Sequence, residues 1–368
     1  MTHQDFKIAL FDAKPYDRFF FDSINAKYEF SLTYFEEKLR PQTAPLAAGF
    51  DAVCAFVNDD LSEQTIETLS QNGVKMIAMR CAGYNNVNLK AACERGIPVV
   101  RVPQYSPYAV AEYALALLMT LNRKIHRAYN RVREGNFSIN GLMGFDLRGK
   151  TVGVIGTGKI GRVFIGLLQG FGMNVLAYDL YPNAAAADEL HFQYVDLDTL
   201  FRNSDIISLH CPLTPENTHL INEKTISEMK PGVVIINTSR GKLIDTTALI
   251  DGLKTGQVGA AGLDVYEEET DYFFEDRSSD VMQDDVLARL TTFPNVIVSS
   301  HQAFFTQEAE SNIAQTTMES LAAFAEGRKL EDAICLNCGG LKRCPGKNRG
   351  EHCSPEPTMI TRVSGKEK

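Results

Sequence analysis

Short apolar runs separated by helix-compatible segments recur along most of the chain. In the first hundred residues, five such runs are predicted to form buried strands: 6–11, 28–33, 52–57, 75–79 and 98–102. Two amphipathic stretches between them, 63–71 and 89–95, are predicted to form helices. Strands that alternate with helices are typical of α/β folds with parallel sheets.

A second and more regular series begins at residue 151. Its strands are predicted at 152–155, 174–178, 205–209, 233–237, 259–263 and 296–299. The prolines of 103–107 interrupt the pattern between the two series and indicate a linker. One long helix is predicted over 108–133, and another over 307–327 closes the globular part of the chain.

Three glycines directly follow the first strand of the second series. Gly156, Gly158 and Gly161 have the G-x-G-x-x-G spacing, a helix-compatible segment follows them, and the next strand ends in Asp179. The first glycine permits a tight turn, the second lets a pyrophosphate approach the backbone, and the third lets the helix pack on the strand. An acid at position 179 binds ribose hydroxyls and repels a 2′-phosphate, so the sequence predicts NAD rather than NADP.

The carboxyl ends of the later strands carry the candidate chemistry, because ligands of doubly wound sheets bind there. These ends hold one arginine (Arg240), one acidic cluster (267–269) and one histidine (His301). Reduction of a 2-keto acid needs a cation for the carboxylate and an acid that protonates the oxygen as hydride arrives. Taken singly, these residues also fit a surface salt bridge, a solvated acidic face and a structural histidine; their shared position favours a site.

Seven motifs, in order, resemble those of the D-isomer-specific 2-hydroxyacid dehydrogenases, and most closely the fermentative D-lactate dehydrogenases. The resemblance covers about residues 6–332. The motifs are R-C-A-G-Y-N-N at 80–86, V-P-Q-Y-S-P at 102–107 with A-E at 111–112, the glycine fingerprint, H-C-P-L-T-P-E-N at 210–217, N-T-S-R-G at 237–241, D-V-Y-E at 264–267 and S-H-Q-A-F at 300–304.

The resemblance implies an α/β fold of two Rossmann-like or flavodoxin-like domains. A doubly wound NAD-binding domain, 108–302, would be inserted into a discontinuous substrate domain, 1–107 with 303–334. The resemblance and the long helix after the linker suggest a homodimer or homotetramer.

The resemblance also implies residue roles. Arg240 would bind the substrate carboxylate and polarise its carbonyl, His301 would be the general acid/base, and Glu269 would pair with His301. The backbone amides of Ala82 and Gly83 would help to hold the carboxylate, with Tyr105 nearby. The residues that would bind NAD are Gly156, Gly158, Lys159, Ile160, Gly161, Asp179, Cys211, Pro212, Asn217, Thr238 and Asp264.

The implied activity is NADH-dependent reduction of pyruvate to D-lactate. Four aromatic residues are candidates for crowding the substrate pocket, which favours a small 2-keto acid: Phe56, Tyr105, Phe304 and Phe305. The alternative is that they are core or hinge residues, and for Phe305 the two interpretations are equal. Two alternatives remain at this point. One is a dehydrogenase for a bulkier D-2-hydroxy acid, and the other is an NAD(H)-sensing interaction protein of the same fold.

Charge and composition narrow the partners. The formal net charge of −9 argues against nucleic acid as the main partner. No apolar stretch is long enough to span a bilayer and the first residues show no signal-peptide pattern, so we expect a cytoplasmic protein without a membrane partner.

The last 34 residues depart from the family pattern. Residues 335–368 hold seven Lys/Arg and three Glu, few apolar residues, and the four cysteines Cys335, Cys338, Cys344 and Cys353. Four thiols at this spacing suggest a zinc ion or an iron–sulfur cluster. The later spacings match no common zinc module, and a partly disordered basic tail with free or redox-active thiols is an equal alternative.

Overall fold

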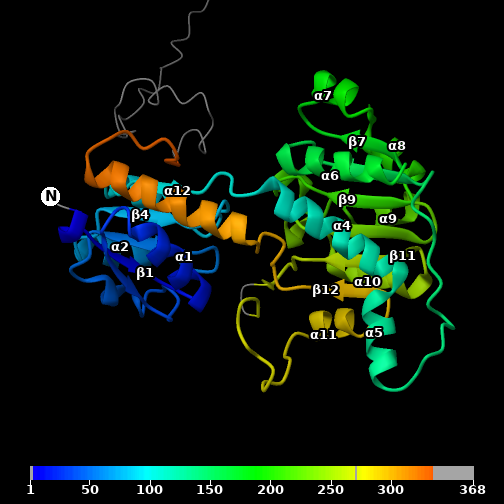
Figure 1. The fold of residues 1–368 in the computed structure, drawn as a ribbon, viewed down its shortest axis with the longest axis horizontal. Helices are drawn as coiled ribbons and strands as arrows, with labels where there is room; N and C mark the ends of the chain where they lie inside the picture. Colours follow the sequence, from blue (N-terminus) through cyan, green and yellow to red (C-terminus); the bar gives the residue numbers. More distant parts are fainter. Residues whose placement is uncertain (1–2, 270–271, 335–368) are drawn as a thin grey trace, which may run out of the picture. The chain divides into compact units, whose positions relative to one another are not determined.

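A computed structural model of the chain describes residues 3–269 and 272–334 (Figure 1). Within this part of the chain, the contacts define two compact units, one made of residues up to 105 together with those from 307 onward, and the other of residues 106–306. The chain passes between the units at 105/106 and 306/307, two and four residues from the boundaries that the family resemblance implies.

The first unit is built on a five-stranded parallel sheet with the order β2-β1-β3-β4-β5. Its strands are β1 (Lys7–Leu10), β2 (Ser31–Tyr34), β3 (Ala52–Ala55), β4 (Met76–Met79) and β5 (Val99–Arg101). All residues of β3 and β4 are buried, because helices cover both faces of a parallel sheet. The helices are η1 (His3–Asp5), α1 (Pro15–Asn25), η2 (Ala44–Ala47), α2 (Glu63–Gln71), α3 (Leu89–Glu94) and α12 (Gln307–Ala325).

The second unit is built on a seven-stranded parallel sheet with the order β12-β11-β10-β9-β6-β7-β8. Its strands are β6 (Thr151–Ile155), β7 (Asn174–Tyr178), β8 (Gln193–Tyr194), β9 (Ile206–Leu209), β10 (Val233–Asn237), β11 (Val258–Leu263) and β12 (Val296–Val298). Its helices are α4 (Pro107–Arg123), α5 (Ile125–Arg133), α6 (Lys159–Gly170), α7 (Ala184–Glu189), α8 (Leu197–Asn203), η3 (Pro215–Asn217), α9 (Glu223–Glu228), η4 (Gly241–Leu243), α10 (Thr246–Thr255) and α11 (Asp285–Thr291).

Strand order in the second unit reverses at β6. From β6 the chain proceeds outward to β7 and β8, and then returns to β9 on the other side of β6. One buried cluster includes Leu118, Phe164 and Leu168 from α4 and α6, and a separate one includes residues of α8, α9 and α10. The predicted α/β class with a doubly wound parallel sheet is therefore confirmed.

The single helix predicted over 108–133 is wrong, because Lys124 divides it into α4 and α5. Lys124 has the left-handed conformation, with φ +50°, and its Nζ donates to the carbonyls of Gly141 and Met143. The apolar stripe that packs α4 on the sheet ends at Leu121, whereas α5 buries no residue. No buried apolar contact therefore favours a continuation of α4 as one straight helix through residue 133.

No helix in the described ranges is both long enough and apolar enough to cross a bilayer. The predicted metal ligands Cys335, Cys338, Cys344 and Cys353 lie outside the described residues.

Candidate active site

The candidate residues of the second unit gather at one edge of its sheet. All the strands of this sheet are parallel, so their carboxyl ends lie at the same edge. The loops after β6, β9, β10, β11 and β12 carry the glycines, Cys211, Thr238 with Arg240, Asp264 with Glu269, and His301, respectively. The reversal of strand order between β6 and β9 is where such sheets bind ligands.

In the glycine turn after β6, Gly156 and Gly161 are closely packed, whereas the space around Gly158 is open. A Cβ on Gly161 would lie 2.0 Å from the carbonyl oxygen of Gly156, so the start of α6 lies directly against the end of β6. A Cβ on Gly158 would meet nothing within 4 Å, and Gly158 offers no capping side chain to α6. Open space in front of a helix N-terminus fits the pyrophosphate of a dinucleotide.

Asp179, at the end of β7, is held in a fixed orientation beside this turn. Its Oδ2 accepts hydrogen bonds from the backbone N–H of Thr157 at 2.6 Å and from the Thr157 hydroxyl at 2.9 Å. Its Oδ1 accepts from the N–H of Tyr181 at 2.8 Å. The Tyr194 hydroxyl lies 2.7 Å from the Thr157 hydroxyl and completes the network. A carboxylate fixed here fits the ribose hydroxyls of NAD.

The loops after β9 and β10 approach each other. Ser239 Oγ donates to the carbonyl of Cys211, and Asn217 Nδ2 donates to the carbonyl of Pro212 at 2.8 Å. Thr238 is buried, and its hydroxyl has no hydrogen-bond partner within the described part of the chain. A buried hydroxyl without a partner is costly, so this atom fits a bound ligand. Burial raises the pKa of the Cys211 thiol to about 11, so that Cys211 lines this region as a neutral thiol.

The three consecutive acids after β11 have three different partners. Glu267 accepts from the N–H and hydroxyl of Thr246 through Oε1 and pairs with His219 Nε2 at 2.8 Å through Oε2. Glu268 is exposed and lies 3.8 Å from Lys242. Glu269 Oε1 lies 2.8 Å from His301 Nδ1, while its Oε2 accepts from the N–H of Tyr266 at 3.0 Å. Of these acids, only Glu269 contacts the candidate general acid/base.

His301 has a backbone conformation that is uncommon for a residue with a side chain, with φ +53°. Its N–H donates to the carbonyl of Asp264 at 2.8 Å. With Nδ1 directed at Glu269, its Nε2 makes no hydrogen bond to any described residue. His210, at the end of β9, has a different environment: burial lowers the pKa of its imidazole to about 4, which makes it unsuited to donate a proton near neutral pH.

Asp264 holds the segment that carries His301. The residue is fully buried, and its Oδ1 accepts from the Ser299 hydroxyl at 2.7 Å and the N–H of Gln302 at 2.9 Å, while Oδ2 accepts from the N–H of Ala303 at 2.7 Å. Burial raises the pKa of this carboxyl. The role of Asp264 in binding NAD stays a prediction. Its anchoring of residues 299–303 is a function that the sequence did not reveal.

Arg240 lies at the start of η4 and is half-buried. Its NH1 donates to the carbonyl of Ser239 at 2.7 Å, and its own carbonyl accepts from Asn237 Nδ2 at 2.9 Å. No carboxylate forms an ion pair with Arg240 among the described residues. The guanidinium is therefore available to an anionic ligand, as a bidentate carboxylate site requires.

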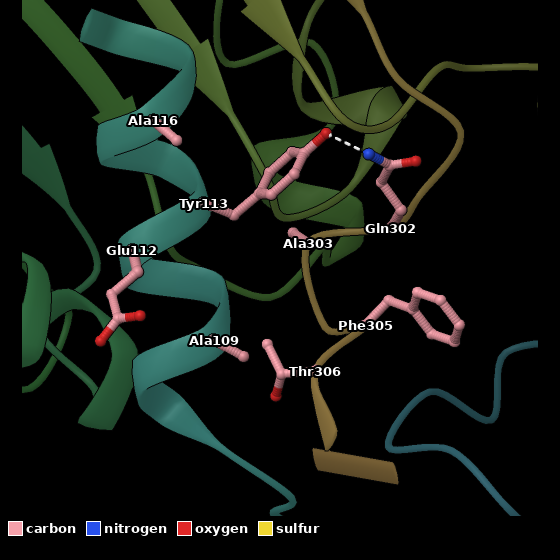
Figure 2. A pocket seen from close by; sticks show the side chains of 8 residues that line it. All are labelled: Ala109, Glu112, Tyr113, Ala116, Gln302, Ala303, Phe305 and Thr306. Carbon is pink, nitrogen blue, oxygen red and sulfur yellow. Dashed lines mark hydrogen bonds between the residues drawn. The ribbon is translucent and has the colours of Figure 1, made fainter. Parts of the chain in front are cut away.

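A pocket of about 320 Å³ lies in the second unit beside the His301 segment (Figure 2). Its wall consists of side chains from α4 and from 302–306: Ala109, Glu112, Tyr113, Ala116, Gln302, Ala303, Phe305 and Thr306. Gln302 Nε2 donates to the Tyr113 hydroxyl at 2.7 Å, which links α4 to the residue after His301. No pattern in the sequence predicts this link.

The remaining predicted substrate residues belong to the first unit. Ala82 and Gly83 follow β4. Tyr105 is the last residue of this unit's first segment, and its carbonyl accepts from Asn312 Nδ2 in α12 at 2.7 Å. Phe56 is buried with its ring 4.8 Å from the Arg80 guanidinium, so it serves the interior of this unit rather than an open pocket. In the second unit, Phe304 is buried and Phe305 is half-exposed.

No group of three or more metal-binding side chains occurs among residues 3–269 and 272–334. The cysteines in these ranges, Cys54, Cys81, Cys93 and Cys211, form no disulfide.

Comparison with known proteins identifies the family. The sequence profile described as "D-isomer specific 2-hydroxyacid dehydrogenase, NAD binding domain" matches residues 115–303. The chain is 55% identical over 321 residues to the D-lactate dehydrogenase of Escherichia coli, covering 87% of this chain and 97% of that protein. It is 54% identical over 328 residues to a 2-hydroxyacid dehydrogenase homolog of Haemophilus influenzae, covering 89% and 99%.

Solved structures agree with this identification. The apo-structure of E. coli D-lactate dehydrogenase matches with a TM-score of 0.83 at 51% identity, covering 89% of this chain and 100% of that chain. The pyruvate reductase of Chlamydomonas reinhardtii matches with a TM-score of 0.86 at 43% identity, covering 89% and 99%. The chain belongs to the family of D-isomer specific 2-hydroxyacid dehydrogenases.

Proposed function

We propose that this chain is an NAD-dependent D-lactate dehydrogenase that reduces pyruvate to D-lactate. The observation that carries the proposal is the 2.8 Å pair between His301 Nδ1 and Glu269 Oε1. It lies at the same sheet edge as Arg240, which has no acidic partner among residues 3–269 and 272–334. The similarity to proteins named D-lactate dehydrogenase and pyruvate reductase supports the choice of substrate.

In the proposed reaction, Arg240 and the amides of Ala82 and Gly83 bind the substrate carboxylate. NADH held at the glycine turn between β6 and α6 would supply the hydride for the keto carbon. As the C=O bond becomes a C–O bond, His301 Nε2 donates its proton to the oxygen and the imidazole becomes neutral. Glu269 holds the ring through Nδ1 and stabilises the imidazolium before transfer, as a carboxylate partner does for other catalytic histidines.

The cofactor assignment rests on the residues around the glycine turn. The open space at Gly158 and the fixed carboxylate of Asp179 fit NAD. So does the Thr238 hydroxyl, which has no hydrogen-bond partner among the residues that the structure describes. Lys159, Ile160, Cys211, Pro212 and Asn217 complete the proposed cofactor site. Asp179 would repel a 2′-phosphate, so NADH is the proposed reductant.

Domain roles and assembly are part of the proposal. We assign substrate binding to the discontinuous domain 1–107 with 303–334, and NAD binding to 108–302. A homodimer or homotetramer is supported by apolar side chains of α5 and the segment after it that are more than half exposed: Ile125, Tyr129, Val132, Phe137, Ile139 and Met143. Light scattering of the full-length protein would measure this assembly.

Two further assignments need direct measurement. A cytoplasmic location fits the absence of a membrane-spanning helix from the described ranges. Metal bound by the tail cysteines would be measured by metal analysis of anaerobically purified protein, with and without residues 335–368. Absence of both zinc and iron would refute the metal hypothesis.

The central test is NADH oxidation by purified enzyme with pyruvate, followed by chiral chromatography of the product. We expect D-lactate, and we expect His301→Asn and Arg240→Met each to lower kcat/KM by about 10²–10⁴-fold. His219→Asn is the matched control, because His219 also lies 2.8 Å from a glutamate but in the structural Glu267 pair. Near wild-type turnover in His301→Asn would refute the mechanism.

A panel of 2-keto acids separates the alternatives. A dehydrogenase for bulkier substrates deserves the comparison, because D-2-hydroxyisocaproate dehydrogenase matches with a TM-score of 0.77 at 35% identity. A higher kcat/KM for branched 2-keto acids than for pyruvate would favour that reading. NADH binding without turnover of any 2-keto acid would instead favour an NAD(H)-sensing interaction protein.

A further inference from the structure

Three consecutive carbonyl groups of the loop after β4 are fixed by hydrogen bonds. The carbonyl of Cys81 accepts from the backbone N–H of Val102 at 3.1 Å. The carbonyl of Ala82 accepts from Arg101 NH1 at 2.8 Å, and the carbonyl of Gly83 accepts from Cys81 Sγ at 3.2 Å. The first two donors come from the end of β5 and the residue after it, so this loop takes its orientation from the neighbouring strand.

Fixing a carbonyl also fixes the next amide. The peptide bonds of this loop are trans, and in a trans peptide the C=O and N–H groups point in opposite directions. The N–H of Ala82 therefore points away from the Val102 N–H, which donates to the Cys81 carbonyl. The N–H of Gly83 points away from the Arg101 guanidinium, which donates to the Ala82 carbonyl. Neither N–H donates a hydrogen bond to any described residue, and both residues are partly exposed.

Two adjacent amides without acceptors form a site for an anion. Backbone N–H groups are strong donors that are normally paired, and a carboxylate with two oxygens can accept from both. The bond from Arg101 to the Ala82 carbonyl is charge-assisted, and it polarises the peptide so that the N–H of Gly83 becomes a stronger donor. The positive charge of Arg101 also favours a negative ligand nearby.

Arg101 is itself held rigidly. It is the last residue of β5 and is half-buried, its guanidinium stacks on the Tyr84 ring at 4.9 Å from the centroid, and its backbone N–H donates to the carbonyl of Asp332 at 3.2 Å. A planar guanidinium can stack and donate at the same time, whereas a lysine ammonium offers a point charge without the stacked plane. The side chain is therefore set before any ligand arrives.

We propose that Arg101 is a positioning residue for the substrate: through the Ala82 carbonyl it orients and strengthens the amide donors that bind the carboxylate of the 2-keto acid. This inference rests on the proposed function and deepens it. Arg101 lies on the carbonyl side of the peptide, so it acts through the amides and not by contact with the reacting atoms.

The test uses the full-length enzyme with the substitution Arg101→Met, which keeps an extended side chain and removes the guanidinium. We expect KM for pyruvate and the inhibition constant of oxamate to rise about tenfold, because the Ala82 carbonyl loses its charge-assisted hydrogen bond from Arg101. We expect kcat to change by less than about threefold. The Kd of NADH should not change. The KM rise should be equal for glyoxylate, pyruvate and 2-oxobutyrate, because they share the carboxylate and differ in side chain.

Arg95→Met is the matched control. Arg95 belongs to the same unit and its NH1 also donates to a backbone carbonyl, that of Ala91 at 3.2 Å, but in α3 and not in the loop after β4. It should leave KM unchanged. Arg101→Lys should give a KM between those of wild type and Arg101→Met, because the charge is kept and the stacked fork is lost.

Three results would overturn the inference: an unchanged KM in Arg101→Met, a loss confined to kcat, or a loss that depends on the substrate side chain. If Arg101→Met does not fold, Tyr84→Leu replaces it, because loss of the stacking ring leaves Arg101 mobile and should raise KM without changing the Kd of NADH. Wild-type enzyme that turns over no 2-keto acid would refute the proposed function, whereas active wild type with an unaffected Arg101→Met refutes this inference alone.

Discussion

Glu310 allows a quantitative prediction about the interior of the first unit. It lies on α12, is 4% exposed, and its Oε1 has no hydrogen-bond partner in the described part of the chain. Burial raises the pKa of this carboxyl from 4.5 to about 7; the negative charge of Asp17 raises it further, and Arg80 acts in the opposite direction. Folding therefore favours the protonated form of Glu310.

The sign and size of the effect follow from linkage. Below pH 4.5 Glu310 is protonated in both states, so it contributes no difference between them. Between pH 4.5 and about 7 the unfolded chain releases this proton while the folded chain keeps it, so the free energy of unfolding falls as pH rises. A shift of this size corresponds to about 3 kcal/mol, reached in full above pH 7.

Glu310→Gln removes this titration and keeps the shape of the side chain. We expect the variant to unfold at the same temperature as wild type at pH 4.5 and at a higher temperature at pH 8, by about 2–4 °C per kcal/mol. Differential scanning calorimetry of the full-length protein at the two pH values measures the difference. Hydrogen exchange of α12 amides localises it to the first unit.

Glu319→Gln, at an exposed position of the same helix, is the control and should give no pH-dependent difference. A raised pKa of Glu310 is refuted if Glu310→Gln and wild type differ by the same amount at both pH values. It is equally refuted if the variant is the less stable protein at pH 8.

Three further predictions concern the second unit. Gly161→Ala places a Cβ 2.0 Å from the Gly156 carbonyl and should weaken NADH binding at least tenfold in a fluorescence titration, whereas Gly166→Ala, with nothing within 4 Å, should bind normally; equal affinities would contradict the close packing. Asp264→Asn replaces one of the two accepting oxygens by an amide donor, so it should lower the free energy of unfolding by about 2 kcal/mol and kcat about tenfold. An unchanged kcat would argue against the anchoring of residues 299–303 by Asp264. Tyr113→Phe removes the hydrogen bond from Gln302 and should cost about 1 kcal/mol with a kcat loss of a few-fold, measured by calorimetry and NADH oxidation; no change in either would show that this bond is dispensable.

Most of the strands and the location of the candidate site were predictable from the sequence. Every apolar run assigned to the second series became a strand within a few residues, because a parallel strand buried on both faces needs a continuous apolar run. Arg240, Glu269 and His301 were predicted at carboxyl ends of strands, and parallel pairing brings such ends to one edge. The site could be located from the sequence because each of its motifs directly follows a predicted strand.

Partner choice was harder to predict. The pattern alone could not distinguish among the three acids of 267–269, and the choice of Glu269 came from the family resemblance. In the structure, Glu267 is already occupied by two partners and is therefore not the partner of His301. Thr246 of α10 donates to its Oε1, and His219, in the loop before α9, pairs with its Oε2. These partners are 21 and 48 residues from Glu267, so no local pattern records them.

The break at Lys124 and the position of Arg101 escaped prediction for a related reason. Lys124 continues a helix-compatible sequence, and the left-handed turn is stabilised by carbonyls 17 and 19 residues further along the chain. In the sequence, nothing distinguishes Arg101 from another arginine at a strand end. Its role becomes visible only from its hydrogen bond to the carbonyl of Ala82, 19 residues away. Both features depend on contacts that only the folded chain brings together.

The position of α12 has a consequence for synthesis on the ribosome. The hydrophobic core of the first unit combines Phe6, Ile8 and Leu10 with Ala314, Met318 and Leu321 of α12, and α12 packs beside α1 (Figure 1). Domains generally fold as units during translation, the N-terminal one first. Here the second unit is complete when residue 306 emerges from the exit tunnel, while the sheet of β1 to β5 still lacks the helix that seals it. The nascent chain must therefore finish its later-encoded unit before its earlier one, and ribosomes stalled near residue 306 should present the first unit to chaperones with its core open.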